Sequence, residues 1–354
     1  MSFNSPFPDV EIPNLSVYDF LFGSIAESDL TKPALIDGTS GDVTTYETLI
    51  GQINGIAGAL AARGLEVGDV VGLHSPNVPA FASVLHGILR AGGTATTINA
   101  LYTAEDIAKQ LTGSGAKFLF TVSPLYPQAK AAAEKVGIDD DHVIVLDGAE
   151  GHPNLRDLLT QGAPAPDVTF DPAEQIAVLP YSSGTTGVPK GVILTHRNLV
   201  ANVAQMEPRV GIDSNDAILA LLPFFHIYGL TVLLNIALKL RAHLVTMPKF
   251  DLVEFLRIIQ DQKLTYLFIA PPVAVALAKH PMIDEYDLSS VHTVFSGAAP
   301  LDEELGKAVA KRLKSRQSPS SRLLTLKWTF SRARSGGQAR RSICSRANSA
   351  FWNS

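Results

Sequence analysis

The sequence contains a single cysteine, Cys344, among its 354 residues, which excludes an intrachain disulfide and any metal site built from several cysteines. It also lacks an uninterrupted apolar stretch of about 18 residues, the length at which a helix could cross a membrane. The first residues carry neither the basic segment nor the apolar segment of a secretion signal. These absences predict a soluble, cytoplasmic protein with no membrane span.

Acidic residues are missing from the last part of the sequence. Residues 305–354 hold 12 of the 29 Lys and Arg and none of the 34 Asp and Glu, although the formal net charge of the chain is only −5. We expect residues 314–354 to be a disordered, basic, Ser/Arg-rich tail, because little apolar surface is available to offset the entropy of ordering it. A frameshift, a retained intron or a gene-model error near Leu313 is the favoured explanation, and a truncated isoform is the alternative.

The positive charge of this tail could also indicate an arm that binds nucleic acid or another anionic surface. We do not favour a nucleic-acid partner, since such arms rarely begin abruptly after an unfinished βα unit.

The rest of the chain has the composition of a globular protein, with 46% hydrophobic and 18% charged residues. Short β-rich runs alternate with longer amphipathic runs, which is typical of parallel sheets covered by helices. Pro76 and Asn77 are interpreted as the start of one such helix. The predicted α/β organisation is an extended N-terminal arm over residues 1–30, a first α/β subdomain over 31–150, a Gly-, Pro- and Asp-rich boundary over 147–172 and a second subdomain over 173–313.

The strongest local motif is Tyr-Ser-Ser-Gly-Thr-Thr-Gly-Val-Pro-Lys-Gly over residues 181–191, between a strand expected at 176–180 and a helix expected from about His196. Its glycines let the backbone approach a ligand closely, its hydroxyl groups lie beside exposed N–H groups, and Lys190 adds a positive charge. Such a loop suits polyphosphate. It differs from the P-loop, because Lys190 is followed by Gly191 rather than by Ser or Thr. A Ser/Thr/Gly cluster alone would more often be an ordinary turn.

The whole string resembles the phosphate-loop motif of the adenylate-forming enzymes, the superfamily of acyl- and aryl-CoA ligases, luciferases and peptide-synthetase adenylation domains. Two further motifs follow in the family's order: Leu-Pro-Phe-Phe-His-Ile-Tyr-Gly-Leu at 222–230 and Val-Phe-Ser-Gly-Ala-Ala-Pro-Leu at 294–301. Together with Met-Pro-Lys-Phe at 247–250, these motifs are most similar in sequence to those of the 4-coumarate:CoA ligase branch. The resemblance covers roughly residues 10–313.

The resemblance implies a fold of two doubly wound βα subdomains, as in the N-terminal domain of that superfamily. It also implies an AMP-forming acid:CoA ligase, in which a small carboxylic acid and ATP give an acyl adenylate and pyrophosphate. CoA then displaces AMP to form acyl-CoA, and Mg²⁺ assists the first step. The acid stays open, because the family accepts cinnamic acids, benzoates, fatty acids and luciferins.

The resemblance also assigns roles to individual residues. Lys190 and His226 would be catalytic, and Lys249 would contact CoA; no metal ligand is assigned. The ATP phosphates would be held by Ser182, Ser183, Gly184, Thr185, Thr186, Gly187 and Lys190, and the acyl group by His226, Tyr228, Gly297, Ala298 and Ala299. Each has a plainer alternative: a histidine after two phenylalanines is usually a core residue, a tyrosine at an apolar helix start usually packs in the core, and a lysine after proline is usually just solvated.

The sequence also departs from the family. The Tyr-Gly-x-Thr-Glu motif, which supplies the usual Mg²⁺-binding glutamate, and the ribose-binding Thr-Gly-Asp motif do not occur in it. The small β-barrel and the C-terminal domain are missing as well. We therefore expect this chain to be an incomplete, inactive copy of the ligase. The alternative is a non-enzymatic remnant that binds nucleotide or a partner protein.

Overall fold

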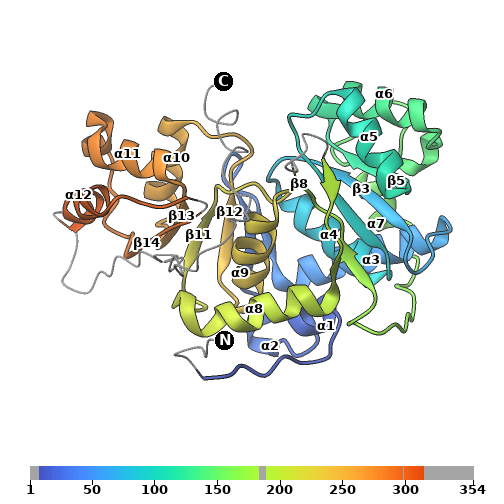
Figure 1. Ribbon diagram of the computed structural model, residues 1–354, viewed down its shortest axis with the longest axis horizontal. Helices are drawn as coiled ribbons and strands as arrows, with labels where there is room; N and C mark the ends of the chain where they lie inside the picture. Colours follow the sequence, from blue (N-terminus) through green and yellow to red (C-terminus); the bar gives the residue numbers. More distant parts are fainter. Residues whose placement is uncertain (1–7, 183–188, 298, 315–354) are drawn as a thin grey trace, which may run out of the picture.

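The computed structural model describes residues 8–182, 189–297 and 299–314, and these residues form two six-stranded sheets covered by helices (Figure 1). The α/β fold expected from the alternation of short and long apolar runs is confirmed. Our expectations for the tail after residue 314, for loop residues 183–187 and for Ala298 lie outside the described residues.

One sheet, which we call sheet A, has the order β14-β13-β11-β12-β1-β2. Its strands pair in parallel except for β2, which is antiparallel to β1. Strands β11 and β13 are short apolar runs with every residue buried, as expected for a parallel sheet covered on both faces. The strands are β1 (Pro33–Asp37), β2 (Val43–Thr45), β11 (Ala217–Ala220), β12 (His243–Thr246), β13 (Tyr266–Ile269) and β14 (Thr293–Ser296).

The other sheet, sheet B, has the order β10-β7-β4-β3-β5-β6 and is parallel except for the β10–β7 pair. A separate two-stranded ribbon of β8 (Tyr181–Ser182) and β9 (Lys190–Gly191) flanks the glycine-rich loop. The strands of sheet B are β3 (Val70–His74), β4 (Thr94–Ile98), β5 (Ala116–Thr121), β6 (Val143–Val145), β7 (Ile176–Val178) and β10 (Leu194–Thr195).

Helices connect the parallel strands, and several begin at a capping side chain. Thr103 and Asp106 form a reciprocal capping box, as do Thr195 and Asn198, which satisfies N–H groups that have no partner inside the helix. The main helices are α3 (Tyr46–Ala62), α4 (Pro79–Arg90), α5 (Ala104–Ser114), α6 (Tyr126–Val136), α7 (Leu155–Thr160), α8 (His196–Val210), α9 (Ile236–Lys239), α10 (Leu252–Asp261), α11 (Pro271–Lys279) and α12 (Glu303–Lys314), with a π-helix, η3 (Gly229–Asn235), leading into α9.

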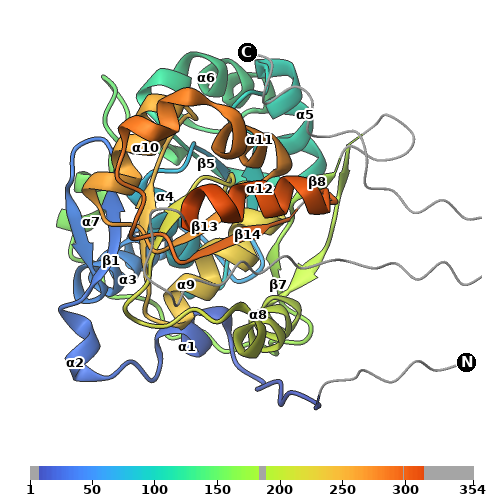
Figure 2. The same cartoon turned by 90° about the vertical axis from the view of Figure 1, so that its left-hand side faces the viewer.

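Alternate residues of the sheet A strands enter two different apolar cores. Ile218 and Phe295 belong to a core shared with sheet B, whereas Leu219 and Val294 belong to a second core formed with α10, α11 and α12. Figure 2 shows these three helices gathered on the side that faces the viewer. Because helices cover both faces, the expected doubly wound arrangement is confirmed.

The N-terminal segment differs from the extended arm expected over residues 1–30. It contains two short helices, α1 (Val17–Phe22) and α2 (Glu27–Leu30). Val17 and Leu21 are only 2% and 1% exposed, and the Val17 N–H donates a 3.1 Å hydrogen bond to Nδ1 of His196 on α8. The expectation was wrong here because helices of six and four residues are too short to show a clear period in the sequence.

The expected boundary at residues 147–172 does not separate the two sheets. Strands β1 and β2 precede that boundary but lie in sheet A, and β7 and β10 follow it but lie in sheet B. Strand β1 pairs in parallel with β12, with Leu35 opposite Leu244. Such pairing joins segments about 200 residues apart, so no local pattern in the sequence could indicate it.

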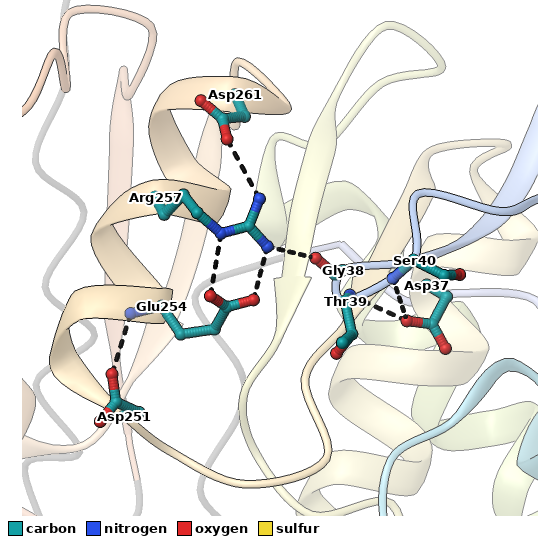
Figure 3. A network of polar contacts seen from close by, with 8 residues as sticks. All are labelled: Asp37, Gly38, Thr39, Ser40, Asp251, Glu254, Arg257 and Asp261. Atoms are coloured by element: carbon teal, nitrogen blue, oxygen red, sulfur yellow. Dashed lines mark hydrogen bonds and ion pairs between the residues drawn. The ribbon is translucent and has the colours of Figure 1, made fainter.

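Arg257 on α10 joins this helix to the turn between β1 and β2 of sheet A (Figure 3). Its guanidinium donates to Glu254 at 2.9 and 2.5 Å, to Asp261 at 3.1 Å and to the Gly38 carbonyl at 2.8 Å. The Asp37 carboxylate shapes the same turn by accepting hydrogen bonds from the backbone N–H groups two and three residues further along the chain. The edge hairpin is thereby held by a helix far from it in sequence.

Candidate functional site

The candidate site lies at the carboxyl ends of the sheet A strands. Strand β11 has β12 on one side and β13 on the other, so the strand order reverses beside it. Ligands of open α/β sheets bind in the crevice at such a reversal. The segment after β11 carries His226 and Tyr228, the loop after β12 carries Lys249, and Gly297 follows β14 directly. The fold therefore brings three separate sequence motifs to one edge of the sheet.

Tyr228 and Gly297 make the closest contact within this set. A Cβ atom on Gly297 would lie 2.1 Å from Tyr228 Oη, so only glycine leaves room for the tyrosine there. The Tyr228 hydroxyl is buried and has no hydrogen-bond partner among the described residues. Burial raises the pKa of this hydroxyl, which stays neutral at physiological pH. A neutral donor without a partner is thus held against a glycine backbone.

His226 is oriented by the backbone of Tyr228. The Tyr228 N–H donates a 3.2 Å hydrogen bond to Nδ1 of His226. His226 is exposed to solvent, yet the protein atoms packed around it lower the pKa of its ring. The neutral form is therefore favoured at pH 7. Because Nδ1 accepts, the proton of the neutral ring belongs on Nε2, where it can be donated to a ligand oxygen.

Lys190 and Ser182 face each other across the β8–β9 ribbon. Ser182 pairs with Lys190 in the ladder, Tyr181 pairs with Gly191, and both Ser182 and Lys190 are exposed. The ribbon therefore brings a hydroxyl and an ammonium group together at the base of loop 183–188. The other five residues to which the sequence assigned ATP phosphates, Ser183, Gly184, Thr185, Thr186 and Gly187, lie outside the described residues.

The remaining predicted residues are less closely connected. Lys249 and Ala299 are exposed, and within the described part of the chain no hydrogen bond or ion pair joins either of them to His226 or Tyr228. Ala298 lies outside the described residues. The ligand assignments of all these residues stay predictions.

Two buried polar residues near the site were missed by the sequence analysis. Asn77 and Thr97 are 4% and 3% exposed, and both hydrogen-bond to the backbone of residues 220–225, immediately before His226. Pro76 and Asn77 had predicted only a helix start. The one available clue was a carboxamide three residues after the apolar run that forms β3, at the end of the strand where ligand-binding loops gather.

Across residues 8–182, 189–297 and 299–314, no cluster of three or more His, Cys, Asp or Glu side chains could hold a metal ion. In the same residues, no helix is long and apolar enough to span a membrane.

The chain matches curated proteins along most of its length. It is 39% identical over 314 residues to 4-coumarate--CoA ligase 2 of Nicotiana tabacum, a match that covers 87% of this chain and 57% of the relative. It is 38% identical over 318 residues to 4-coumarate--CoA ligase 1 of Arabidopsis thaliana, covering 87% of this chain and 56% of that protein. The chain thus spans little more than half the length of these relatives.

Solved structures share the fold. A long-chain-fatty-acid-CoA ligase from Archaeoglobus fulgidus superposes with a TM-score of 0.82 at 26% identity, covering 91% of this chain and 66% of that one. A red-emitting luciferase from Phrixothrix hirtus superposes with a TM-score of 0.80 at 28% identity, covering 88% and 77%. ATP-bound MatB from Rhodopseudomonas palustris gives 0.74 at 27% identity, covering 88% and 60%.

A family model described as AMP-binding enzyme matches residues 24–319, which is most of the chain. This match includes the glycine-rich loop, the segment of His226 and Tyr228, and Gly297. The chain belongs to the family of AMP-binding enzymes.

Proposed function

We propose that the described residues form the acyl- and ATP-binding part of an AMP-forming acid:CoA ligase of the 4-coumarate:CoA ligase type. The observation that carries the proposal is the meeting of His226, Tyr228 and Gly297 at the carboxyl edge of sheet A. The names of the curated relatives and the ATP-bound state of one structural neighbour support it.

In this proposal, His226 orients the acid. Its neutral ring donates the Nε2 proton to one carboxylate oxygen and leaves the other oxygen free to attack the α-phosphorus of ATP. A neutral ring suits this task, because a cationic one would hold the carboxylate more tightly and make it a weaker nucleophile. Tyr228 and Gly297 would form the pocket wall, where the missing side chain of the glycine leaves room for the Tyr228 ring that faces the acyl group.

Lys190 and Ser182 would bind the phosphates that leave. When the carboxylate oxygen bonds to the α-phosphorus, the bond from that phosphorus to the β-phosphate oxygen breaks, and its electrons depart with pyrophosphate. A fixed ammonium group and a hydroxyl donor stabilise the growing negative charge. In the second half-reaction the CoA thiolate attacks the acyl carbon and AMP leaves. Lys249 is the proposed contact for CoA.

Mg²⁺ would help to neutralise the phosphate charge in such a reaction. The described residues offer no cluster of ligands for it, so no step above is assigned to the ion.

A finer proposal concerns the 354-residue polypeptide itself. The strings Tyr-Gly-x-Thr-Glu and Thr-Gly-Asp do not occur in its sequence, and by the family resemblance these motifs would supply groups that bind adenine, ribose and Mg²⁺. We propose that the 354-residue polypeptide binds its ligands weakly and does not catalyse the ligase reaction. Removing one fixed charge-stabilising donor from an enzyme typically costs about 10²–10³ in rate, and several are absent together here.

The test is acid-dependent exchange of labelled pyrophosphate into ATP, with cinnamic, benzoic and fatty acids. We would compare the 354-residue chain with a chimera that joins residues 1–313 to the remaining part of the Nicotiana tabacum relative. Exchange only by the chimera, lost in its His226→Ala variant, is the expected result. A folded chimera that exchanges with none of the acids would refute the ligase assignment. Exchange by the purified 354-residue chain would refute the finer proposal.

A further inference from the structure

The segment that leads to His226 is held by sheet B, although it continues a strand of sheet A. Asn77 lies between β3 and α4 and is 4% exposed. Its Nδ2 donates hydrogen bonds to the Ala220 carbonyl at 2.8 Å and the Leu222 carbonyl at 2.9 Å, and its Oδ1 accepts one from the Phe224 N–H at 2.8 Å. One side chain thus bonds three backbone groups within five residues.

These partners fix the orientation of the Asn77 amide. Two carbonyl groups require the NH₂ end, and one N–H group requires the oxygen end, so a rotated amide would face every partner with the wrong atom. Aspartate has almost the same shape but would set an oxygen against both carbonyls. The site therefore demands the chemistry of asparagine as well as its size.

Thr97 on β4 makes a further bond to the same segment. Its hydroxyl donates to the Phe225 carbonyl at 2.8 Å, and the side chain is 3% exposed. The Phe224 ring packs beside Phe81 of α4, with ring centroids 5.5 Å apart, and is fully buried. Polar contacts from Asn77 and β4 and an apolar contact from α4 therefore hold residues 220–225 from several directions.

The position of residues 220–225 determines where His226 and the start of η3 lie. The His226 N–H donates to the Pro223 carbonyl at 3.1 Å, and the His226 carbonyl accepts from the Leu230 N–H at 3.0 Å. The start of η3 approaches equally closely, since a Cβ on Gly229 would lie 2.1 Å from the Pro223 carbonyl oxygen. Little freedom is left between the anchored residues and the two side chains of the site.

We propose that Asn77 and Thr97 are positioning residues for His226 and Tyr228, so that sheet B sets the geometry of the acyl site built on sheet A. The inference rests on the proposed function only where it calls this site the acyl site. A merely structural role would lower stability without moving the two rings. A positioning role moves the rings and changes ligand affinity, because small displacements of oriented groups are costly.

The chain offers matched variants. Thr97→Val keeps the shape and removes the donor, whereas Thr97→Ser keeps the donor and removes a methyl group. Ser83→Ala on α4 is the control for a buried hydrogen bond, since Ser83 is fully buried and donates at 2.6 Å to Gln52, away from the segment. Asn77→Asp tests the need for the amide. If that variant does not fold, Thr97→Val and Thr97→Ser still test the positioning role.

The experiment uses the 354-residue chain, with NMR ring signals of His226 and Tyr228 and the affinity for 4-coumarate as readouts. We expect Thr97→Val to shift both ring signals and to weaken 4-coumarate binding at least about tenfold. Thr97→Ser should restore both, and Ser83→Ala should lower the melting temperature while leaving both unchanged. Unshifted rings in Thr97→Val, or equal shifts in Ser83→Ala, would overturn the proposal. If wild type does not bind 4-coumarate, the proposed function fails for that acid, and the ring signals still decide the positioning role.

Discussion

The Tyr228 hydroxyl stands against the main chain of Gly297, at a place where a Cβ atom on residue 297 would lie 2.1 Å from it. The tyrosine belongs to the segment after β11 and the glycine follows β14, so the contact joins two strands of sheet A that are not neighbours. The glycine is needed here for the approach of another side chain. The sizes of residues 228 and 297 are therefore coupled.

Gly297→Ala tests this coupling. The added methyl group would overlap the Tyr228 ring, and we expect the free energy of unfolding to fall by about 1–3 kcal/mol, the usual cost of overpacking. In a Tyr228→Leu background, which lacks the overlapping ring atoms, the same substitution should cost at least about 0.5 kcal/mol less. Urea denaturation of the two single variants and the double variant measures this difference. Additive effects would mean that the residues do not constrain each other.

Tyr228→Phe addresses the buried hydroxyl. A buried polar group without a partner costs about 1–3 kcal/mol, so removing it should leave stability unchanged or raise it by about 1 kcal/mol. Tyr266→Phe is the matched control, because the Tyr266 hydroxyl is buried but donates at 3.0 Å to the Val210 carbonyl. That variant should lose about 1 kcal/mol. Equal losses in the two variants, measured by urea denaturation, would show that the Tyr228 hydroxyl has a partner.

The buried histidines predict a stability that falls in acid. Burial lowers the pKa of His86 to about 3 and those of His74 and His196 to about 4, whereas an unfolded histidine titrates near 6.5. Below pH 6.5 the unfolded chain therefore binds more protons than the folded chain. The stability that these groups contribute is present in full above pH 6.5 and is lost as the pH falls toward 4 and then 3.

His86→Leu should weaken this dependence. Neither ring nitrogen of His86 has a hydrogen-bond partner among the described residues, so the substitution breaks no such bond there. Between pH 7.5 and 5.0 the variant should lose about 2 kcal/mol less stability than wild type. Urea denaturation at the two pH values gives the comparison. Parallel losses in both proteins would mean that His86 is not buried in its neutral form.

Local features of the sequence predicted local features of the fold well. The helix expected from about His196 begins at His196, where Thr195 caps it, and the strand expected at residues 176–180 covers 176–178. Period and capping are encoded by neighbouring residues, so they can be recognised without the fold. Three of the family motifs, at residues 222–230, 247–250 and 294–301, likewise predicted the segments that meet at the sheet A edge.

Features that depend on distant partners could not be predicted in this way. The pairing of β1 with β12 places a strand from the start of the chain inside the later sheet. Asn77 reaches Ala220 across 143 positions, and nothing beside Asn77 in the sequence indicates that partner. These contacts follow from how two sheets pack together, which a period of two or four residues does not encode.

Lys190→Ala tests the phosphate assignment. Lys190 is exposed and lies opposite Ser182 in the ribbon that flanks the glycine-rich loop, so its ammonium group can reach a ligand without structural change. We expect weak binding of pyrophosphate to the 354-residue chain, strongest at low salt because exposed charges are screened. The substitution should reduce the affinity about tenfold or more, since charge-assisted hydrogen bonds to phosphate are among the stronger ones.

The control for that test is Lys130→Ala on α6, which removes the same charge from a partly exposed lysine outside the ribbon. If only net charge matters, both variants should weaken binding equally, because each lowers the net charge of the protein by one unit. If Lys190 contacts the phosphates, its variant alone should lose the affinity and most of the salt dependence. Calorimetric titration with pyrophosphate at 20 and 200 mM salt separates these outcomes. Losing a direct contact with the phosphates makes the affinity less dependent on salt concentration, whereas removing a distant charge does so much less. Tight binding that is unaffected by Lys190→Ala would mean that the phosphates bind elsewhere on the chain.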